Sequence, residues 1–444
     1  MIKKSVSAVM LCLLFLFTLF LQTGCNLDKR YIEDDETIIN QIDPIDYDEA
    51  SAFPYIYIET DNRKNVESKD EYLSCVVRLD NCEEQYNLYG DDGRNAQIKG
   101  RGNSSWFLMS KKSYTLKFNT RIDLFGFGKA KKYTLIANHS DKSLSRNFIA
   151  YSLASKLGLQ ETSCVQPINL VLNGIHRGVY LLCEQVEIGK NRIDIDGSLD
   201  DIDTGYIIEL DQRAINEGEL NVDYFVLGEG DEQNYYALKD PKSDDDGFTP
   251  INLIFINDYM SECFDAIHGD SYERVEELID VDSFARCYIV QEIFNNVDVG
   301  FSSFFFYKDR GGKLFNGPVW DFDISSGNCS YTPSANDPNY LYAKNSNIWY
   351  KKLLEFEEFE NLVKNIFTEN LNIIQETIDD VVSYQMEYKA NNEINFVIWK
   401  IMGKWVYPNP DEIINITTFE GQLEFLENWL KSKIEYMKTV YFNH

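Results

Sequence analysis

The chain has 444 residues and a formal net charge of −30, from 72 acidic and 42 basic side chains. This excess of negative charge argues against nucleic acid or an anionic membrane surface as the main partner, because both repel an acidic protein. Hydrophobic residues make up 44% of the chain, and no stretch after the first 25 residues is long and apolar enough to span a bilayer.

The first 25 residues have the pattern of a lipoprotein signal peptide. Two lysines precede an apolar run that ends at Gly24-Cys25, so residues 1–25 predict export with lipid attachment at Cys25. Gln22 departs from the leucine that lipoproteins usually carry there, and simple secretion or a retained anchor are the alternatives. Residues 26–52 are acidic with few apolar side chains, which predicts a tether. We expect a lipid anchor at the outer face of the bacterial cytoplasmic membrane.

Alternating apolar and polar residues predict a β meander after the tether. The predicted strands are 55–59, 75–79, 96–99 and 113–118. A helix is expected over 143–157, ended by Gly158. Strands 168–172 and 179–183 then form a hairpin, because Asn173-Gly174 between them is a strong turn signal. A further strand is expected at 206–210.

The character of the chain changes from residue 250 onward. Helices are expected at 251–264, 281–294, about 356–390 and 419–441, with a short strand at 304–307. Strands first and helices second predict the α+β fold class, with a sheet-rich N-lobe at about 53–245 and a helical C-lobe at about 246–440. No Pro/Gly/Ser-rich linker interrupts this part, so 53–440 is expected to be one two-lobed domain.

Several kinds of site are excluded by the residues. Seven cysteines follow Cys25 without a CxxC pair, and an odd number cannot form a full disulfide framework, although Cys75 and Cys82 are placed to pair across a hairpin. None of the four histidines stands at metal-ligand spacing from another ligand. Neither a GxSxG nor a GxxxxGK[ST] motif occurs, so nucleophilic-hydrolase and P-loop chemistry are both disfavoured.

Two groups of acids lie where predicted elements end in loops. Asp298 follows the helix at 281–294, and Asp321 and Asp323 follow the later strand. Carboxylate oxygens at such positions accept protons or hold Mg²⁺ or Ca²⁺, although a solvated acid that caps a turn is the common alternative. Asp321 stands out, because an unpaired carboxylate among Val319, Trp320 and Phe322 is costly.

A loop with two glycines, Lys99 to Trp106, is followed by Lys111 and Lys112. Exposed backbone N–H groups in such a loop approach an anion closely, and a following lysine reaches the same phosphates. An ordinary turn with surface lysines is the alternative. The chain order of loop, lysine, helix, hairpin, helix and two acids matches the order of protein-kinase parts.

These segments together are similar to the CotH kinase family, the atypical protein kinases of the spore-coat CotH type. The resemblance runs from about residue 53 to about residue 440 and predicts an atypical protein-kinase-like fold. The segments that carry it are Ile98–Trp106, Lys111–Tyr114, Ser140–Asn147, Arg177–Leu182, Glu184–Val186 and Gly317–Asp323.

The resemblance implies roles for the acids and the lysines. Asp298 resembles the family's catalytic acid, and Asp321 its metal-binding acid. Asp323 is then either a second metal ligand or a hydrogen-bonding helper of the loop. Lys112 is the first candidate for the phosphate-contacting lysine, and Lys111 is its rival.

Four further residues receive nucleotide-site roles from the same resemblance. Arg101 and Asn103 are placed in the loop that covers the nucleotide. Arg146 is expected to pair with an acid near the site. Glu184 is either a hinge group near the adenine or an exposed strand end.

The function implied is transfer of a phosphoryl group from ATP to Ser or Thr hydroxyls of a protein, with Mg²⁺ or Mn²⁺, or Ca²⁺, as the cation. An exported protein meets little ATP, so the alternative is an inactive, cation-binding surface protein that has the same fold and binds a surface partner. A glycosidase that uses Asp321 and Asp323 is disfavoured, because carboxylates two residues apart on an extended segment point to opposite faces.

Overall fold

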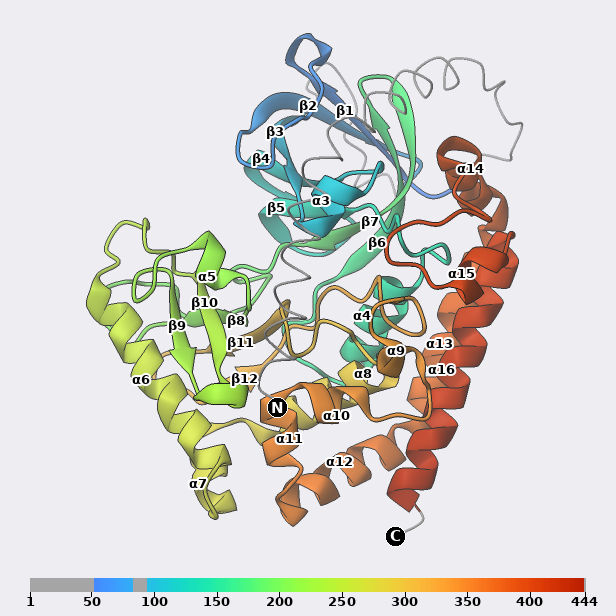
Figure 1. The fold of residues 1–444 in the computed structure, drawn as a ribbon. Helices are drawn as coiled ribbons and strands as arrows, with labels where there is room; N and C mark the ends of the chain where they lie inside the picture. Colours follow the sequence, from blue (N-terminus) through green and yellow to red (C-terminus); the bar gives the residue numbers. More distant parts are fainter. Residues whose placement is uncertain (1–51, 83–93, 443–444) are drawn as a thin grey trace, which may run out of the picture. The chain divides into compact units, whose positions relative to one another are not determined.

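The computed structural model describes residues 52–82 and 94–442. Within these residues seven strands close into a barrel in the order β1-β2-β3-β4-β5-β7-β6 (Figure 1). Neighbouring strands are antiparallel except β1 and β6, which pair in parallel and close the barrel. The strands are β1 (Tyr55–Thr60), β2 (Leu73–Asp80), β3 (Arg94–Arg101), β4 (Ser113–Asp123), β5 (Lys129–Ile136), β6 (Val165–Leu172) and β7 (Ile175–Glu184).

The barrel forms because its strands alternate in polarity. In β2, buried and exposed residues alternate, and Val77 and Leu79 join Ile98 and Leu116 in the barrel interior. The turn between β6 and β7 is Asn173-Gly174, with φ of 54° and 82°. Positive φ at both residues is the primed turn that fits the twist of a hairpin.

A second sheet, of five strands in the described part of the chain, has the order β12-β11-β8-β10-β9. It combines strands from before and after residue 245, because β8 pairs with β11 antiparallel. Both of these strands are buried along their whole length, as expected for central strands covered on two faces. The strands are β8 (Tyr206–Leu210), β9 (Tyr224–Leu227), β10 (Asn234–Asp240), β11 (Phe304–Lys308) and β12 (Leu314–Asn316).

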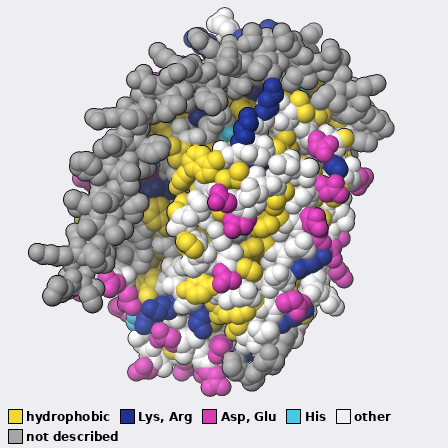
Figure 2. All heavy atoms as spheres, turned by 45° about the vertical axis from the view of Figure 1, so that its right-hand side comes forward, with side chains coloured by type: hydrophobic (Ala, Val, Ile, Leu, Met, Phe, Trp, Pro, Cys, Tyr) yellow, Lys and Arg dark blue, Asp and Glu magenta, His cyan; other side chains and the backbone are white. Residues whose placement is uncertain are grey.

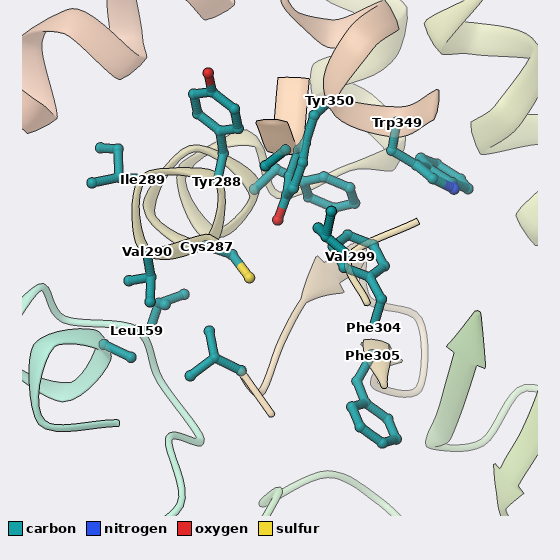
Figure 3. Packing of buried hydrophobic residues seen from close by; sticks show 14 of the residues in the cluster. Leu159, Cys287, Tyr288, Ile289, Val290, Val299, Phe304, Phe305, Trp349 and Tyr350 are labelled. Carbon is teal, nitrogen blue, oxygen red and sulfur yellow. The ribbon is translucent and has the colours of Figure 1, made fainter. Parts of the chain in front are cut away.

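The largest hydrophobic cluster surrounds α8 (Val281–Phe294), which is buried along most of its length. Figure 3 shows residues of α8, β11 and α11 in this cluster. The ring of Tyr350 lies 5.1 Å from that of Tyr288 and 5.4 Å from that of Phe304. This packing fixes the two ends of the loop 295–303 that joins α8 to β11.

Figure 1 labels most of the remaining helices and colours them by their position in the sequence. They are α3 (Ser104–Leu108), α4 (Arg146–Lys156), α5 (Ala214–Glu217), α6 (Pro250–Ile267), α7 (Tyr272–Leu278), α9 (Pro333–Asn336), α10 (Tyr342–Ser346), α11 (Ile348–Leu353), α12 (Glu357–Glu369), α13 (Leu371–Glu387), α14 (Lys389–Trp399), α15 (Asp411–Asn415) and α16 (Phe419–Phe442), with short 3₁₀ turns η2 (Asp61–Arg63) and η4 (Gly230–Glu232). In the described residues, no helix combines the length and apolar character needed to cross a membrane.

The α+β class is confirmed, and each predicted strand lies within an observed one. The predicted meander is wrong in one respect, because it closes into a barrel through a pairing of β1 with β6 that local pattern does not reveal. The helix predicted from residue 143 begins at Arg146, since Leu144 has a φ of 55°. The helix predicted over 356–390 is broken near Asn370, where α12 ends and α13 begins.

Cys75 carries a free, buried thiol in the described structure, so the candidate disulfide with Cys82 is not formed. The predicted signal peptide, lipidation site at Cys25 and tether to residue 51 lie outside the described residues. The surface in Figure 2 shows acidic side chains spread among apolar ones over one face. This distribution agrees with the net charge of −30.

Candidate functional site

Two loops of the structure carry the three predicted acids. Asp298 lies in the loop that follows α8, and its carbonyl accepts hydrogen bonds from the backbone N–H groups of Phe301 (2.8 Å) and Ser302 (2.9 Å). Asn296 links this loop to the other one, because its Oδ1 accepts from Asp298 N at 3.2 Å and its Nδ2 donates to Trp320 O at 3.4 Å. The tight turn and this bridge hold Asp298 beside the second loop.

Asp321 has a φ of 62°, in the left-handed region that is uncommon for residues other than glycine. Its backbone N–H donates to the Tyr151 hydroxyl at 3.3 Å, and Phe322 N donates to Asn147 Oδ1 at 2.8 Å. Both partners belong to α4, and the buried Phe322 ring packs against Phe294 at 5.3 Å. The surroundings therefore hold the backbone in a conformation that costs energy, as is common where a side chain must be aimed.

The three carboxyl groups lie close enough to affect one another's ionisation. Burial, and next the charge of Asp321, raises the pKa of Asp298 to about 7, while Arg213 opposes the rise. Burial also raises the pKa of Asp321, against the attraction of Arg101 and Arg213. The pKa of Asp323 is raised well above its usual value by burial and by Asp321, although Ser140 Oγ donates to its Oδ2 at 2.9 Å. The three carboxyl groups therefore resist ionising together, and a bound cation would favour their ionised forms.

Arg101 is the predicted loop residue that reaches the acids from the barrel. It ends β3, its guanidinium lies 5.2 Å from the ring centroid of Trp320, and its Nη1 donates to Thr134 Oγ1 at 2.6 Å. Burial lowers its pKa, and Asp321 is the acid that counters this most. Gly100 next to it has to be glycine, since a Cβ there would lie 2.2 Å from the Trp106 ring.

The structure places Lys111 and Asn103 in contacts that hold the fold. Lys111 is buried, and its Nζ donates to Ala137 O (2.8 Å), Val179 O and Asn395 Oδ1 (2.9 Å). These bonds use all three hydrogens of an ammonium group, and burial lowers the pKa of Lys111 well below its ordinary value. Asn103 precedes α3 and accepts from Lys69 Nζ at 3.0 Å.

Lys112, the first candidate for the phosphate contact, lies against the loop. Its Nζ donates to Trp106 O at 2.5 Å and lies 5.5 Å from the centroid of the Trp106 ring. Arg101, by contrast, is the cation from the barrel that interacts with Asp321. Among these cations, Arg101 therefore has a pKa that responds to the charge of Asp321.

Arg146 and Glu184 both form buried ion pairs. Arg146 pairs with Asp141 at 2.5 Å and donates through Nε and Nη2 to Ser325 O and Ser326 O, just after Asp323. Arg146 therefore supports the loop that carries Asp321 and Asp323.

Glu184 ends β7 and pairs with Arg192, and its Oε2 accepts from Cys164 N at 2.7 Å. Burial raises its pKa, against the attraction of Arg192. Of the two roles expected for it, the exposed strand end is wrong, because Glu184 is 5% exposed.

Sequence reasoning missed a second strand end beside the acids. Glu209 in β8 accepts from Ser303 N at 2.9 Å and pairs with Lys239 at 2.7 Å. Two residues on, Asp211 pairs with Arg213 at 2.8 Å. The available signal was the pair of charged residues, Asp211 and Arg213, just after the predicted strand at 206–210, because loops at strand ends often carry functional residues.

The charge of Asp321 raises the pKa of Asp323, and a divalent cation held by both carboxylates would relieve this repulsion. Among the described residues, no group of three or more His, Cys, Asp or Glu side chains is arranged as a complete metal site. Mg²⁺ commonly binds through one or two carboxylates, with the remaining ligands from substrate phosphates and water.

Comparison with known families identifies one model, described as CotH kinase protein, that matches residues 98–437. The match covers the glycine loop, both acid loops and the helices that follow. A search of curated proteins found no match.

Proposed function

Because the chain belongs to the CotH kinase family, we propose that it transfers the γ-phosphoryl group of ATP to a Ser or Thr hydroxyl of a protein. The observation that carries this proposal is that Asn296 joins the loops of Asp298 and Asp321, while Arg101 of the barrel acts on Asp321. A kinase needs these elements together: an acid for the acceptor hydroxyl, an acid for the metal and a cation for the phosphates.

We propose that the site residues come from two parts of the chain, as they do in a two-lobed kinase. The barrel supplies Arg101, and the part that contains α8 and the second sheet supplies the acids. The chain leaves β7 at Glu184 between these parts, so the adenine is proposed to lie near Glu184 and the triphosphate to extend from there toward Asp321.

In the proposed reaction, the oxygen of the acceptor hydroxyl forms a bond to the γ-phosphorus, and the bond from this phosphorus to the β,γ-bridging oxygen breaks. Asp298 orients the hydroxyl and takes its proton, and ADP leaves. Arg101 binds the nucleotide phosphates and orients them. Asp321 and Asp323 would hold Mg²⁺ or Mn²⁺, which supplies neutralisation of phosphate charge when bound.

The test is incubation of the purified 26–444 protein with labelled ATP and Mg²⁺ or Mn²⁺, with a serine-rich acceptor present. Asp298→Asn should keep nucleotide binding nearly intact and lower transfer by about two to four orders of magnitude, the usual range for a positioned base. Asp321→Asn should weaken both, because the phosphates lose their cation. Asp380→Asn, which changes an exposed acid on α13, is the matched control and should change neither.

A second candidate is a cation-binding surface protein without phosphoryl transfer. It is favoured by the mutual effect of Asp321 and Asp323, which fits a cation with or without nucleotide. Metal binding by the native protein without any nucleotide binding would decide for this candidate. If neither acid substitution alters nucleotide binding or transfer in folded protein, the assignment of both acids is wrong.

We also propose that the protein acts outside the cytoplasm, held at the membrane through a lipid on Cys25. The support is the apolar run that ends at Gly24-Cys25. The acceptor is then a protein or surface partner reached from the outer face of the membrane.

A further inference from the structure

Arg213 is held in a fixed position by the turn that follows β8. Its backbone N–H and its Nε both donate to Asp211 Oδ1, at 3.0 and 2.8 Å, and its Nη2 donates to Asp211 Oδ2 at 3.4 Å. Asp211 is buried, with 5% of its side chain exposed, whereas 29% of the Arg213 side chain is exposed. The two-pronged pair therefore orients the guanidinium and leaves part of it accessible.

The same turn is joined to the loop of Asp298 through the backbone. Gln212 N donates to Phe301 O at 2.8 Å, and Phe301 N donates to Asp298 O at 2.8 Å. Ser303, at the end of this loop, donates to Glu209 on β8. Arg213 and Asp298 are thus parts of one hydrogen-bonded unit, so their separation is set by the fold.

The charge of Arg213 acts on both proposed functional acids, Asp298 and Asp321. Arg101 acts on Asp321 from the barrel, whereas Arg213 lies in the turn after β8 of the second sheet. Among the described residues no hydrogen-bond partner is found for Arg213 Nη1. The oriented guanidinium therefore has an available donor, and it lies on a turn that is hydrogen-bonded to the loop of Asp298.

We propose that Arg213 is a catalytic residue that binds the γ-phosphoryl group while it passes from ATP to the acceptor. This inference rests on the proposed function and extends it. In the transition state the negative charge is spread over the three equatorial oxygens of the transferred group, and a guanidinium supplied by the same chain would neutralise part of it. The proton still goes to Asp298 and ADP still leaves, so Arg213 exchanges no proton and forms no covalent bond.

The experiment compares Arg213→Gln and Arg213→Lys with Arg274→Gln in the 26–444 protein. Arg274 forms exposed ion pairs on α7 with Glu262 and Glu277 and is the matched control. We expect kcat for Arg213→Gln to fall by at least about 10²-fold, as for loss of one charge-stabilising donor, with partial recovery in Arg213→Lys. The control should stay within about threefold of wild type.

A second measurement separates a role in transfer from a role in folding. Binding of ADP with Mg²⁺ should change by less than about threefold in Arg213→Gln, because ADP lacks the transferred group. Binding of ADP with aluminium fluoride, which mimics that group, should weaken by at least about tenfold in this variant. If Arg213→Gln does not fold, the same pair of measurements on Arg213→Lys decides.

The outcomes distinguish this inference from the function on which it rests. Wild-type protein that transfers no phosphate under any cation overturns both. Wild-type transfer together with an Arg213→Gln rate within threefold of wild type overturns the role of Arg213 alone. Equal weakening of ADP binding and of aluminium fluoride binding also overturns it, since the residue would then only shape the pocket.

Discussion

Asp141 is the residue whose loss should destabilise the folded chain most clearly. Its carboxylate is fully buried and accepts hydrogen bonds from Ser143 N (3.1 Å), Ser143 Oγ (2.5 Å), Ser145 N (3.0 Å), Arg146 N (2.9 Å) and Arg146 Nη1 (2.5 Å). Asp141→Ala leaves the buried charge of Arg146 without its counter-ion, which in proteins costs about 3–5 kcal/mol. Orphaned N–H groups at the start of α4 add to this cost.

The assay is equilibrium unfolding in urea, followed by fluorescence of the tryptophans. Since whole domains are stable by about 5–15 kcal/mol, a loss of about 4 kcal/mol should shift the midpoint strongly. The matched control is Asp380→Ala. Asp380 of α13 forms an exposed ion pair with Lys156 at the end of α4, and such pairs contribute about 1 kcal/mol or less.

A double variant, Asp141→Ala with Arg146→Met, tests the cause of the loss. Removal of both charges should recover part of the stability, because the unpaired buried charge is then absent. If Asp141→Ala costs less than about 1 kcal/mol, or if the double variant is no more stable than Asp141→Ala, the reasoning from a buried charge is refuted.

Three further predictions concern the site and the anchor. The pKa of Asp298 is raised to about 7, and this acid must be ionised to take a proton. The transfer rate should therefore rise with pH through about 7, or through a lower pH where a bound cation favours the ionised form. A rate independent of pH between 5 and 8 at constant metal occupancy would contradict this. Burial raises the pKa of Asp321 and Asp323, so protons compete with a cation for these carboxylates at low pH. Mn²⁺ should therefore raise the midpoint of thermal unfolding more at pH 7.5 than at pH 5.5, and chelation should reverse the gain. Equal shifts at both pH values, or the same shift in Asp321→Asn, would argue for another metal site. Cys25→Ala should abolish incorporation of a fatty-acid analogue and processing at this site, and lipid label that persists in the variant would rule out Cys25 as the attachment point.

Local sequence pattern predicted the elements well because strand and helix periodicity is local. It also singled out Asp298, Asp321 and Arg101, which the structure brings together. Arg101 ends β3, and the two acids lie in the loops that follow α8 and β12, where side chains are free to serve a site. The helix start at Arg146 was missed because hydrogen bonds to Asp141 shape the preceding turn.

The contact of Glu209 in β8 with the loop that follows α8 depends on tertiary structure. Glu209 meets Ser303, 94 residues later, because β8 pairs with β11. The choice between Lys111 and Lys112 has the same origin. These neighbours have the same side chain, and a partner 284 residues away, Asn395, is among the residues that fix the role of Lys111.

The contacts of Lys111 also bear on the order in which the chain matures during synthesis. Ala137 and Val179 emerge with the barrel, but Asn395 belongs to α14, which is made more than two hundred residues after β7. Asn395 also accepts from Val179 N, and α14 packs on β7. A nascent barrel therefore holds a lysine with an incomplete set of acceptors until α14 has been made, and chains cut short before α14 should be the ones that quality-control proteases remove.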